Sequence, residues 1–363
     1  MMRPPILTAP IGVGFVGLSA ARGWAARAHV PALAMLPDYA IRGLVASSAE
    51  SAAQAALKYS VPFATHRLAD LLARDDIELV VVTLRVPEHR RVVEAALQAG
   101  KAVFCEWPLA HDLAEAQALA ALAQQAARPC FVNLQGRGSP ALRFIADLLT
   151  QGYVGEVLST SLIADGGAPW GLEYVGPGDL MYQDCRNGAT MLTIPFGHML
   201  NTLNRVFGEL DSPRSMIAVR RPVTHRLNSD ELIEVTAPDQ VCVSGRFRTG
   251  AIGSLHYRAG MRNGTRFHWE INGSAGDLVM TASTGHFQFG NISIRGSTAG
   301  AKNLVDLPIP DDYWPLAGNR TSVAYNVALV YAAIAQDLRT GTVLAPTFAN
   351  AVELHNALQA LEK

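Results

Sequence analysis

A glycine-poor loop follows the first apolar run of the chain, IGVGFVG (residues 11–17). A dinucleotide-binding turn has the pattern G-x-G-x-x-G, because glycine lets the backbone approach a pyrophosphate at a helix N-terminus. Here a serine stands where the second glycine belongs, but its hydroxyl can donate to a phosphate, and two alanines keep the loop slim. The residues of this segment that we expect to contact a dinucleotide are Gly17, Leu18, Ser19, Ala20, Gly23 and Trp24.

The same loop nearly matches the strand–G-x-S-x-G–helix turn that exposes a serine nucleophile. This alternative is weaker, because the loop follows the first strand and the downstream chain lacks an obvious oxyanion motif. A plain strand-to-helix turn, with small residues chosen for packing, is the third interpretation. We favour the nucleotide-binding turn.

Strands and helices alternate through the first third of the chain, which predicts a doubly wound parallel sheet with right-handed crossovers. Apolar runs without alternation are typical of parallel strands covered on both faces. The expected strands are residues 11–17, 39–46, 77–84, 101–107 and 130–134. The expected helices are about 24–36, 48–59, 87–100 and 112–126, the second of them opened by a capping serine.

Ligands of such a sheet bind beyond the carboxyl ends of its strands. The further residues that we expect near the dinucleotide are Ser47, Ser48, Thr83, Leu84, His89, Glu106, Trp107 and Gln135. His89 opens a helix, and we favour a structural role for it over a catalytic one. Trp24 and Trp107 can either stack on the nicotinamide or ribose or fill the core.

The choice between NAD and NADP stays open at this stage. An acidic residue at the end of the second strand would favour NAD through its ribose diol. The strand instead ends in LVASSAE, with Ser47 and Ser48. Two hydroxyls can accept a 2′-phosphate and Arg22 can assist, so both cofactors are retained.

The pattern changes after about residue 150. Strand-like segments with turn signals between them predict an α+β domain with an open, mostly antiparallel sheet. Helical patterns are expected there only around 188–206, 322–339 and 347–362. We therefore divide the chain into an NAD(P)-binding domain (1–135), a substrate and oligomerisation domain (136–345) and a closing helix that packs back on the first domain (346–363).

Composition excludes several classes of protein. The net charge of −1 gives no attraction to nucleic acid or to anionic membranes. No apolar run is long enough for a signal peptide or a membrane span. Four scattered cysteines predict buried thiols in a reducing compartment, so we expect a cytoplasmic protein. No spacing of histidines and cysteines predicts a metal site.

Several separated motifs carry a resemblance to a known family. They include the strand that ends in Thr83, His89 at the start of a helix, AALQAGKAVFCE (95–106), INGSAGDLVM (271–280) and the closing segment 346–363. Together they resemble the glucose-fructose oxidoreductase / inositol dehydrogenase / MocA family. The resemblance implies a Rossmann domain for NAD or NADP. It also implies a second domain whose sheet forms a substrate wall and an oligomer interface, hence a homodimer or tetramer.

The chain departs from the family at its catalytic positions. The family's Glu-Lys-Pro is replaced by Glu-Trp-Pro, with Trp107 at the lysine position. The family's histidine matches His198, but Ile194 and Asn201 stand where the two flanking aspartates belong. Oxidation of an alcohol by NAD needs a group that takes the hydroxyl proton, which contributes about 10²–10⁴-fold in rate. An indole only donates, so Trp107 cannot fill that role.

Other residues can supply part of the missing chemistry. His198 can donate to a substrate oxygen, or it can be a hydrogen-bonded structural histidine. Tyr182 can act as acid or base beside it, although a tyrosine is more often packed than catalytic. The residues that we expect to contact a substrate are Arg137, Asp184 and Asn201.

The motifs VGFVGLSAARGWAARAHVPAL (13–33), CEWPLA (105–110) and LQGRGSP (134–140) resemble the branch that contains the yeast galactose-regulon repressor. Two functions therefore compete. The first is an NAD(P)-dependent oxidoreductase with a non-standard site, acting on a sugar, polyol, imine or similar small carbonyl compound. The second is a non-catalytic dinucleotide-binding regulator that contacts a protein partner. We favour the oxidoreductase.

Overall fold

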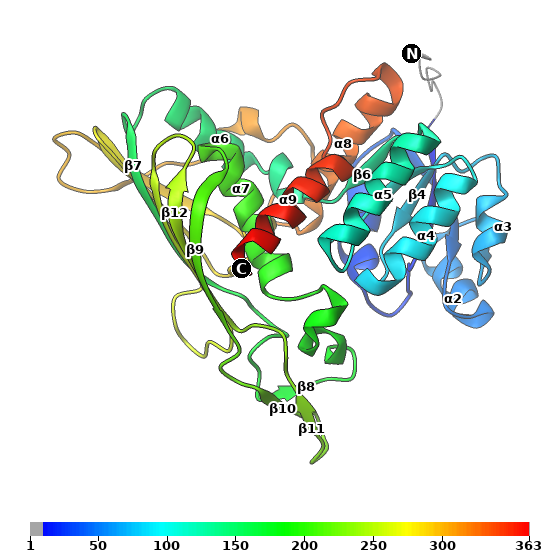
Figure 1. Cartoon of the computed structure of the whole chain (residues 1–363). Helices are drawn as coiled ribbons and strands as arrows, with labels where there is room; N and C mark the ends of the chain where they lie inside the picture. The colour runs from blue at the N-terminus through cyan, green and yellow to red at the C-terminus, as the bar shows by residue number, and fades with distance from the viewer. Residues whose placement is uncertain (1–9, 363) are drawn as a thin grey trace. The chain divides into compact units, whose positions relative to one another are not determined.

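The computed structural model describes residues 10–362, which divide into two compact units (Figure 1). Unit 1 comprises Met1–Gln135 and Leu316–His355, and unit 2 comprises Gly136–Pro315 and Asn356–Lys363. Each unit has its own sheet and its own apolar core. The long helix α9 (Phe348–Leu361) begins in unit 1 and ends in unit 2.

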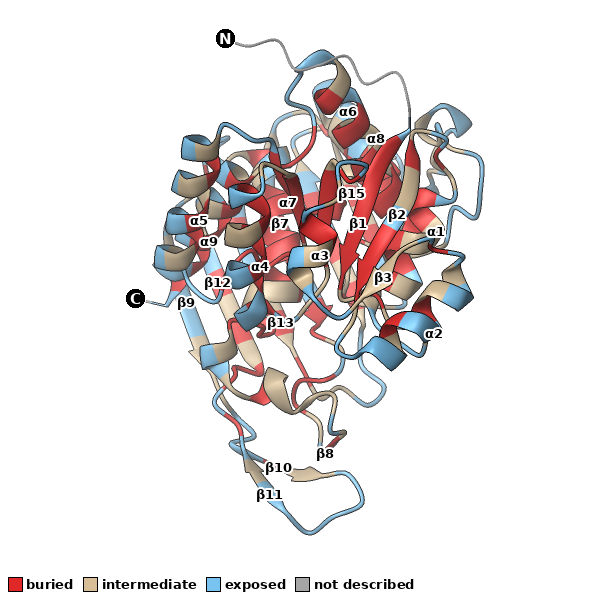
Figure 2. Cartoon of the chain, turned by 90° about the vertical axis from the view of Figure 1, so that its right-hand side faces the viewer, coloured by how far each residue is buried: buried red, intermediate tan, exposed pale blue. Residues whose placement is uncertain are grey.

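Unit 1 is built on a six-stranded parallel sheet with the order β3-β2-β1-β4-β5-β6. Its strands are β1 (Ile11–Val16), β2 (Tyr39–Val45), β3 (Ala64–Thr65), β4 (Leu79–Val82), β5 (Ala102–Cys105) and β6 (Cys130–Val132). Strand β1 is buried along its whole length (Figure 2), as are β4 and β5, because helices cover both faces of the sheet. The predicted Rossmann domain is confirmed.

The helices of unit 1 begin and end at recognisable signals. They are the π-helix η1 (Ala25–His29), α1 (Val30–Leu33), α2 (Ala49–Tyr59), α3 (Leu68–Leu72), α4 (Val86–Gln98), α5 (Leu113–Ala126) and α8 (Ala324–Thr340). Ser48 caps α2, as predicted, by accepting from the backbone N–H of Ser51, and Asp112 caps α5 in the same way. These caps fix where α2 and α5 begin.

Unit 2 is built on an eight-stranded sheet with the order β17-β16-β15-β14-β7-β13-β12-β9. Its strands are β7 (Val157–Asp165), β9 (Leu210–Ala218), β12 (Gln240–Phe247), β13 (Ile252–Arg258), β14 (Phe267–Gly273), β15 (Gly276–Ala282), β16 (Ser293–Thr298) and β17 (Val305–Asp306). Only β7 and β13 pair in parallel among these neighbours. The predicted open, mostly antiparallel sheet is confirmed.

One face of this sheet is covered by helix α7 (Gly197–Phe207), which follows the π-helix η5 (Leu192–Phe196). Phe207 of α7 packs on Phe247 and Trp269, with ring centroids 5.3 and 6.3 Å apart. Along β13 and β14 buried residues alternate with exposed or partly exposed ones, so the opposite face of the sheet is open to solvent. A three-stranded sheet of β8 (Tyr174–Val175), β10 (Val223–Arg226) and β11 (Leu232–Glu234) projects from the same unit (Figure 1).

Three observations differ from the sequence-based expectations. Helix α6 (Pro140–Thr150) was not expected, although Ser139 before Pro140 is a typical helix start. Residues 316–345, expected in the second domain, lie in unit 1, because α8 buries apolar side chains in the core of the six-stranded sheet. All four cysteines were expected to be buried, but Cys185 is exposed and Cys242 is only partly buried.

Candidate functional site

The loop after β1 has the backbone geometry that a dinucleotide turn requires. Gly17 has a φ of +107°, and a Cβ atom at this position would lie 3.0 Å from the carbonyl oxygen of Thr83. Gly23 has a φ of +109°, with open space where a Cβ would stand. Both positions favour glycine, so the backbone can be approached closely at each end of the loop.

Helix α2 holds the middle of this loop. The Tyr59 hydroxyl donates to the Ser19 carbonyl at 3.1 Å, and the Lys58 ammonium donates to the Ala20 carbonyl at 2.6 Å. The Ser19 hydroxyl oxygen accepts from the Ala21 N–H at 3.2 Å. Because a trans peptide points its N–H opposite its C=O, the N–H of Ala20 is directed away from α2. The side chain of Leu18 is buried, so this residue can offer a ligand only its backbone.

The two serines after β2, Ser47 and Ser48, differ in their hydrogen bonding. Ser48 uses its oxygen to accept from the N–H of Ser51 at 3.1 Å and donates to the Ser51 hydroxyl at 3.0 Å. Ser47 is exposed. Of the two serines that the sequence singled out, Ser48 is therefore committed to capping its helix.

The segment after β4 is tied to its surroundings. Thr83 donates from its hydroxyl to the Val16 carbonyl at 3.1 Å, which joins the ends of β1 and β4. The buried ring of His89 has one nitrogen 3.1 Å from the Leu84 carbonyl and the other 3.2 Å from the Leu109 carbonyl. Burial lowers the pKa of His89. These contacts hold two loops together.

Glu106, directly after β5, is held by a buried hydrogen-bond network. Its Oε1 accepts from His29 Nε2 at 2.6 Å and from Asn133 Nδ2 at 2.7 Å. Since a carboxylate only accepts, Nε2 carries the proton of the neutral imidazole, and in that form Nδ1 accepts from the Tyr331 hydroxyl at 2.8 Å. The Tyr39 hydroxyl donates to the Tyr331 carbonyl. We name this set the Glu106 network: Tyr39, His29, Tyr331, Glu106 and Asn133.

Sequence reasoning missed four members of the Glu106 network: Tyr39, His29, Asn133 and Tyr331. A signal was present, because His29 lies on the inward face of an alanine-rich segment, four residues after Ala25. A polar side chain on a buried face must find a hydrogen-bond partner. The identity of that partner depends on Glu106 and Tyr331, which are distant in sequence.

Trp107 is buried, with 5% of its surface exposed. Its ring packs on that of His355, with the ring centroids 4.6 Å apart and an angle of 48° between the ring planes. Burial lowers the pKa of His355 to about 4, so this imidazole is neutral near pH 7. Gln135 is also buried and accepts from Asn133 at 3.4 Å. The position that carries the family's lysine is thus filled here by a packed aromatic ring.

Unit 2 brings together three of the predicted site residues: Arg137, His198 and Asn201. Arg137 lies in the 3₁₀-helix η2 (Gln135–Gly138) and donates from Nε to the Asn201 amide oxygen at 3.1 Å. His198 and Asn201 are both buried on α7. Among the described residues, neither His198 Nδ1 nor Asn201 Nδ2 has a hydrogen-bond partner. Each such buried group costs about 1–3 kcal/mol if it stays unpaired.

The electrostatics of this cluster keep its histidines neutral. Burial, with a smaller contribution from His286, lowers the pKa of His198 to about 3. Burial also lowers the pKa of His286 to about 4, although Asp165 opposes that effect. The amide nitrogen of Gln288 lies 3.3 Å from His286 Nδ1. At pH 7, His198 is therefore neutral, so it can donate one hydrogen bond and accept one, but it does not hold an added proton.

Two other candidates have different partners. The Tyr182 ring, in the 3₁₀-helix η3 (Leu180–Gln183), packs edge-on against Trp170 at 5.8 Å. Asp184 forms an ion pair with Arg186 at 2.7 Å, and the guanidinium lowers the pKa of that carboxyl. Asp184 thus already has a cationic partner on the surface.

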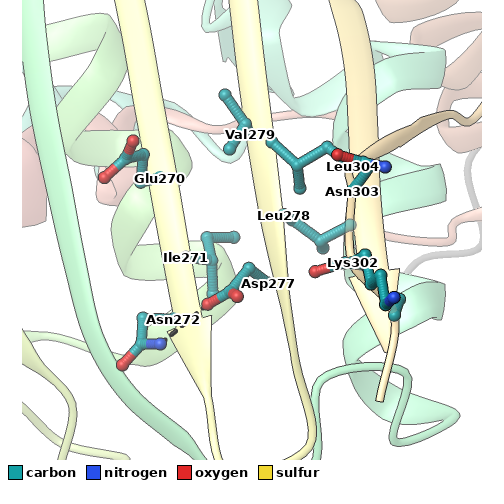
Figure 3. Close-up of a pocket in the computed structure, with 11 residues that line it drawn as sticks. Glu270, Ile271, Asn272, Asp277, Leu278, Val279, Lys302, Asn303 and Leu304 are labelled. Atoms are coloured by element: carbon teal, nitrogen blue, oxygen red, sulfur yellow. Dashed lines mark hydrogen bonds between the residues drawn. The ribbon is translucent and has the colours of Figure 1, made fainter. Parts of the chain in front are cut away.

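A separate hollow of about 530 Å³ lies on the exposed face of the unit 2 sheet (Figure 3). Side chains of β14 and β15 line it together with the loop that carries Lys302. Asn272 donates to Asp277 at 2.7 Å across these strands. No group of three or more potential metal ligands occurs among residues 10–362. In the same range, no helix combines the length and apolar character of a membrane span.

Comparison with known proteins adds independent information. The family model described as "Oxidoreductase family, NAD-binding Rossmann fold" matches residues 11–134, and the one described as "Gal80p, C-terminal domain" matches residues 140–282. The galactose/lactose metabolism regulatory protein GAL80 of Saccharomyces cerevisiae is 28% identical over 82% of this chain and 72% of its own length. Dehydrogenase aclE of Aspergillus oryzae is 28% identical over 74% of this chain and 76% of its own.

Solved structures establish the same fold. A super-repressor mutant of Gal80p from Saccharomyces cerevisiae superimposes with a TM-score of 0.85 over 98% of this chain and 95% of that one, at 23% identity. Levoglucosan dehydrogenase in complex with NADH and levoglucosan superimposes with a TM-score of 0.80 over 97% of this chain and 96% of that one, at 20% identity. A regulator and an enzyme therefore share this architecture.

Proposed function

Because this chain belongs to the Gfo/Idh/MocA family of oxidoreductases, as its motifs predicted, we propose that it is a nicotinamide-dependent reductase of a small carbonyl or imine compound related to sugars. Unit 1 binds the dinucleotide, and unit 2 binds the substrate. The observation that carries this proposal is the cluster of Arg137, His198 and Asn201, in which His198 Nδ1 and Asn201 Nδ2 have no hydrogen-bond partner among the described residues.

The loop after β1 fits a dinucleotide. Gly17 and Gly23 leave the backbone open at positive φ, and Ala20 directs its N–H away from the helix that holds the loop. The Glu106 network fixes a carboxylate at the end of β5, where it can accept from a ribose hydroxyl. No carboxylate directly follows β2, so we expect both NADH and NADPH to bind, with Ser47 available to the 2′-phosphate.

His198 suits carbonyl reduction better than alcohol oxidation. A neutral imidazole polarises a carbonyl by donating an N–H, which stabilises the negative charge that develops on oxygen. The bound reduced cofactor supplies the hydride, and the product oxygen then takes a proton from water. With a pKa of about 3, His198 is a poor base for the reverse reaction.

A regulatory function is the second candidate, favoured by the packing of Trp107. The family's lysine position is occupied by a buried ring on His355, and the galactose regulators are similar over most of this chain. In this case the dinucleotide would be a signal, and the output would be a contact with a protein partner.

One experiment separates the two functions. Purified protein is titrated with NADH and NADPH, and the absorbance of each reduced cofactor is then followed with a panel of sugars, sugar-derived ketones and imines. Turnover that falls at least 100-fold in His198→Gln, but not in the control His225→Gln on strand β10 of the three-stranded sheet, supports the reductase. Tight dinucleotide binding without turnover of any compound contradicts the reductase and favours the regulator.

We further propose that the exposed face of the eight-stranded sheet is a contact between identical chains. It carries apolar side chains among polar ones, with Met216 72% and Ile163 41% exposed. Light scattering after gel filtration should show a dimer or tetramer for the wild type and a smaller species for Met216→Arg combined with Ile163→Arg. A wild-type monomer would contradict this assembly.

A further inference from the structure

Two buried donors on helix α7 point to the chemical class of the ligand. His198 and Asn201 are three residues apart, so they lie on the same face of the helix. They are 6% and 4% exposed, and each has a nitrogen without a partner among the described residues. A buried donor without an acceptor marks a place where a ligand group or water belongs.

The orientation of the Asn201 amide follows from Arg137. A guanidinium can only donate, so the atom that Arg137 Nε contacts at 3.1 Å must be the amide oxygen. The NH₂ group of Asn201 is therefore directed elsewhere, and it can only donate. In the tautomer that is protonated at the unpaired Nδ1, the neutral His198 ring contributes a second N–H one helical turn away.

Asp165, the carboxylate that acts on the neighbouring His286, is already engaged by other groups. His286 and Gln288 approach from the turn between β15 and β16. The nearby Asp165 is engaged by the Arg266 guanidinium and by the N–H of Gly167. A neutral hydroxyl would bring a proton that needs an acceptor, whereas a carboxylate brings acceptors only.

We propose that Arg137, His198 and Asn201, which we name the α7 donor cluster, bind the carboxylate of a small sugar acid or hydroxy acid. The two N–H groups of His198 and Asn201 match the two carboxylate oxygens, and the adjacent Arg137 guanidinium favours negative charge. The proposal rests on the proposed function only in assigning substrate binding to unit 2. It narrows the substrate to a carbonyl compound that also carries a carboxylate.

The test compares two molecules of the same carbon skeleton, D-gluconate and D-glucitol, by calorimetric titration of the full chain without dinucleotide. D-Gluconate should bind at least tenfold more tightly. Asn201→Asp keeps the size of the side chain and gives Arg137 an ionic partner, so the fold is preserved. This variant should weaken D-gluconate binding at least tenfold, while the control Asn228→Asp, at an exposed position in the turn after β10, should leave it unchanged.

Several outcomes overturn the proposal. These are equal affinity for D-gluconate and D-glucitol, no binding of either, or the same affinity in Asn201→Asp. Inorganic phosphate that binds as tightly as D-gluconate, with the same loss in Asn201→Asp, overturns the assignment to a carboxylate. Turnover assays on the same preparation separate the two proposals. Reduction of neutral sugars without binding of D-gluconate would support the reductase and contradict the carboxylate site. Binding of D-gluconate without turnover of any compound would support the carboxylate site and contradict the reductase.

Discussion

Tyr331→Phe removes one oxygen from the Glu106 network and leaves the ring in place. The lost hydroxyl donates to His29 Nδ1 at 2.8 Å, and His29 in turn donates to Glu106. Tyr331 is fully buried, with its ring packed against Phe104 at 4.9 Å. The backbone carbonyl of Tyr331, which accepts from Tyr39, is unaffected by the substitution.

The expected cost follows from the burial of His29, which is 1% exposed. Without the tyrosine hydroxyl, His29 Nδ1 loses its hydrogen-bond partner and becomes a buried acceptor that water cannot reach. Leaving such a group unpaired lowers the free energy of unfolding by about 1–3 kcal/mol. For a domain of 150–250 residues, this corresponds to a decrease in Tm of about 2–4 °C per kcal/mol.

The assay is thermal unfolding followed by near-ultraviolet circular dichroism, with Tyr313→Phe as the matched control. Tyr313 also donates to a single acceptor, Asp147 at 2.6 Å, but both side chains are exposed and water replaces the bond. We expect the control to change the free energy of unfolding by less than about 0.5 kcal/mol. Equal effects of the two substitutions, or no change in Tyr331→Phe, would refute the connection of Tyr331 to His29.

Three further predictions concern the loop, the histidines and the lysine position. Gly17→Ala, at φ +107° and 3.0 Å from the Thr83 carbonyl oxygen, should weaken NADH binding at least tenfold in a fluorescence titration. The control Gly250→Ala, which also needs a positive φ (+97°) but lies in a turn of unit 2, should leave NADH binding unchanged. If both substitutions weakened NADH binding by a similar factor, the role of the loop would be contradicted. Burial lowers the pKa of His355 from its ordinary value of 6.5 to about 4 in the folded protein, so the unfolded chain takes up the proton first and stability falls as pH drops below 6.5. When the pH is lowered from 7 to 5, the free energy of unfolding, measured by denaturant titration, should fall by about 2 kcal/mol less in His355→Gln than in the wild type. Equal decreases in the two proteins would show that His355 is not buried. Trp107→Lys should lower stability by about 3–5 kcal/mol without raising NADH turnover, because it removes a packed ring; a gain in turnover would show that lysine is accommodated as in the family.

The elements of unit 1 could be predicted because their signals are local. Apolar runs without alternation marked the strands, and Ser48 marked the start of α2 by its capping chemistry. Gly17, directly after β1, marked the turn that needs a positive φ. Each of these features depends on a few neighbouring residues, so the chain order alone was sufficient.

The candidate site was predicted only in part. The motifs identified His198, Asn201 and Glu106, but not the partners that give them their properties. The low pKa of His198 depends on its burial and on His286, which is 88 positions later in the numbering. The alternatives for Trp107 were also left open by sequence, because only its packing on His355 decides what the ring touches.

By itself, the sequence determined a Rossmann domain, an antiparallel second sheet and the loss of the family's lysine, since these depend on residue type and local periodicity. Tertiary structure decided which polar groups are paired. It joined His29 to Glu106 and Tyr331, placed α8 in unit 1, and left His198 Nδ1 and Asn201 Nδ2 on α7 without a hydrogen-bond partner within residues 10–362. The physical reason is that burial and hydrogen-bond partners come from residues distant in the chain, and no local pattern encodes them.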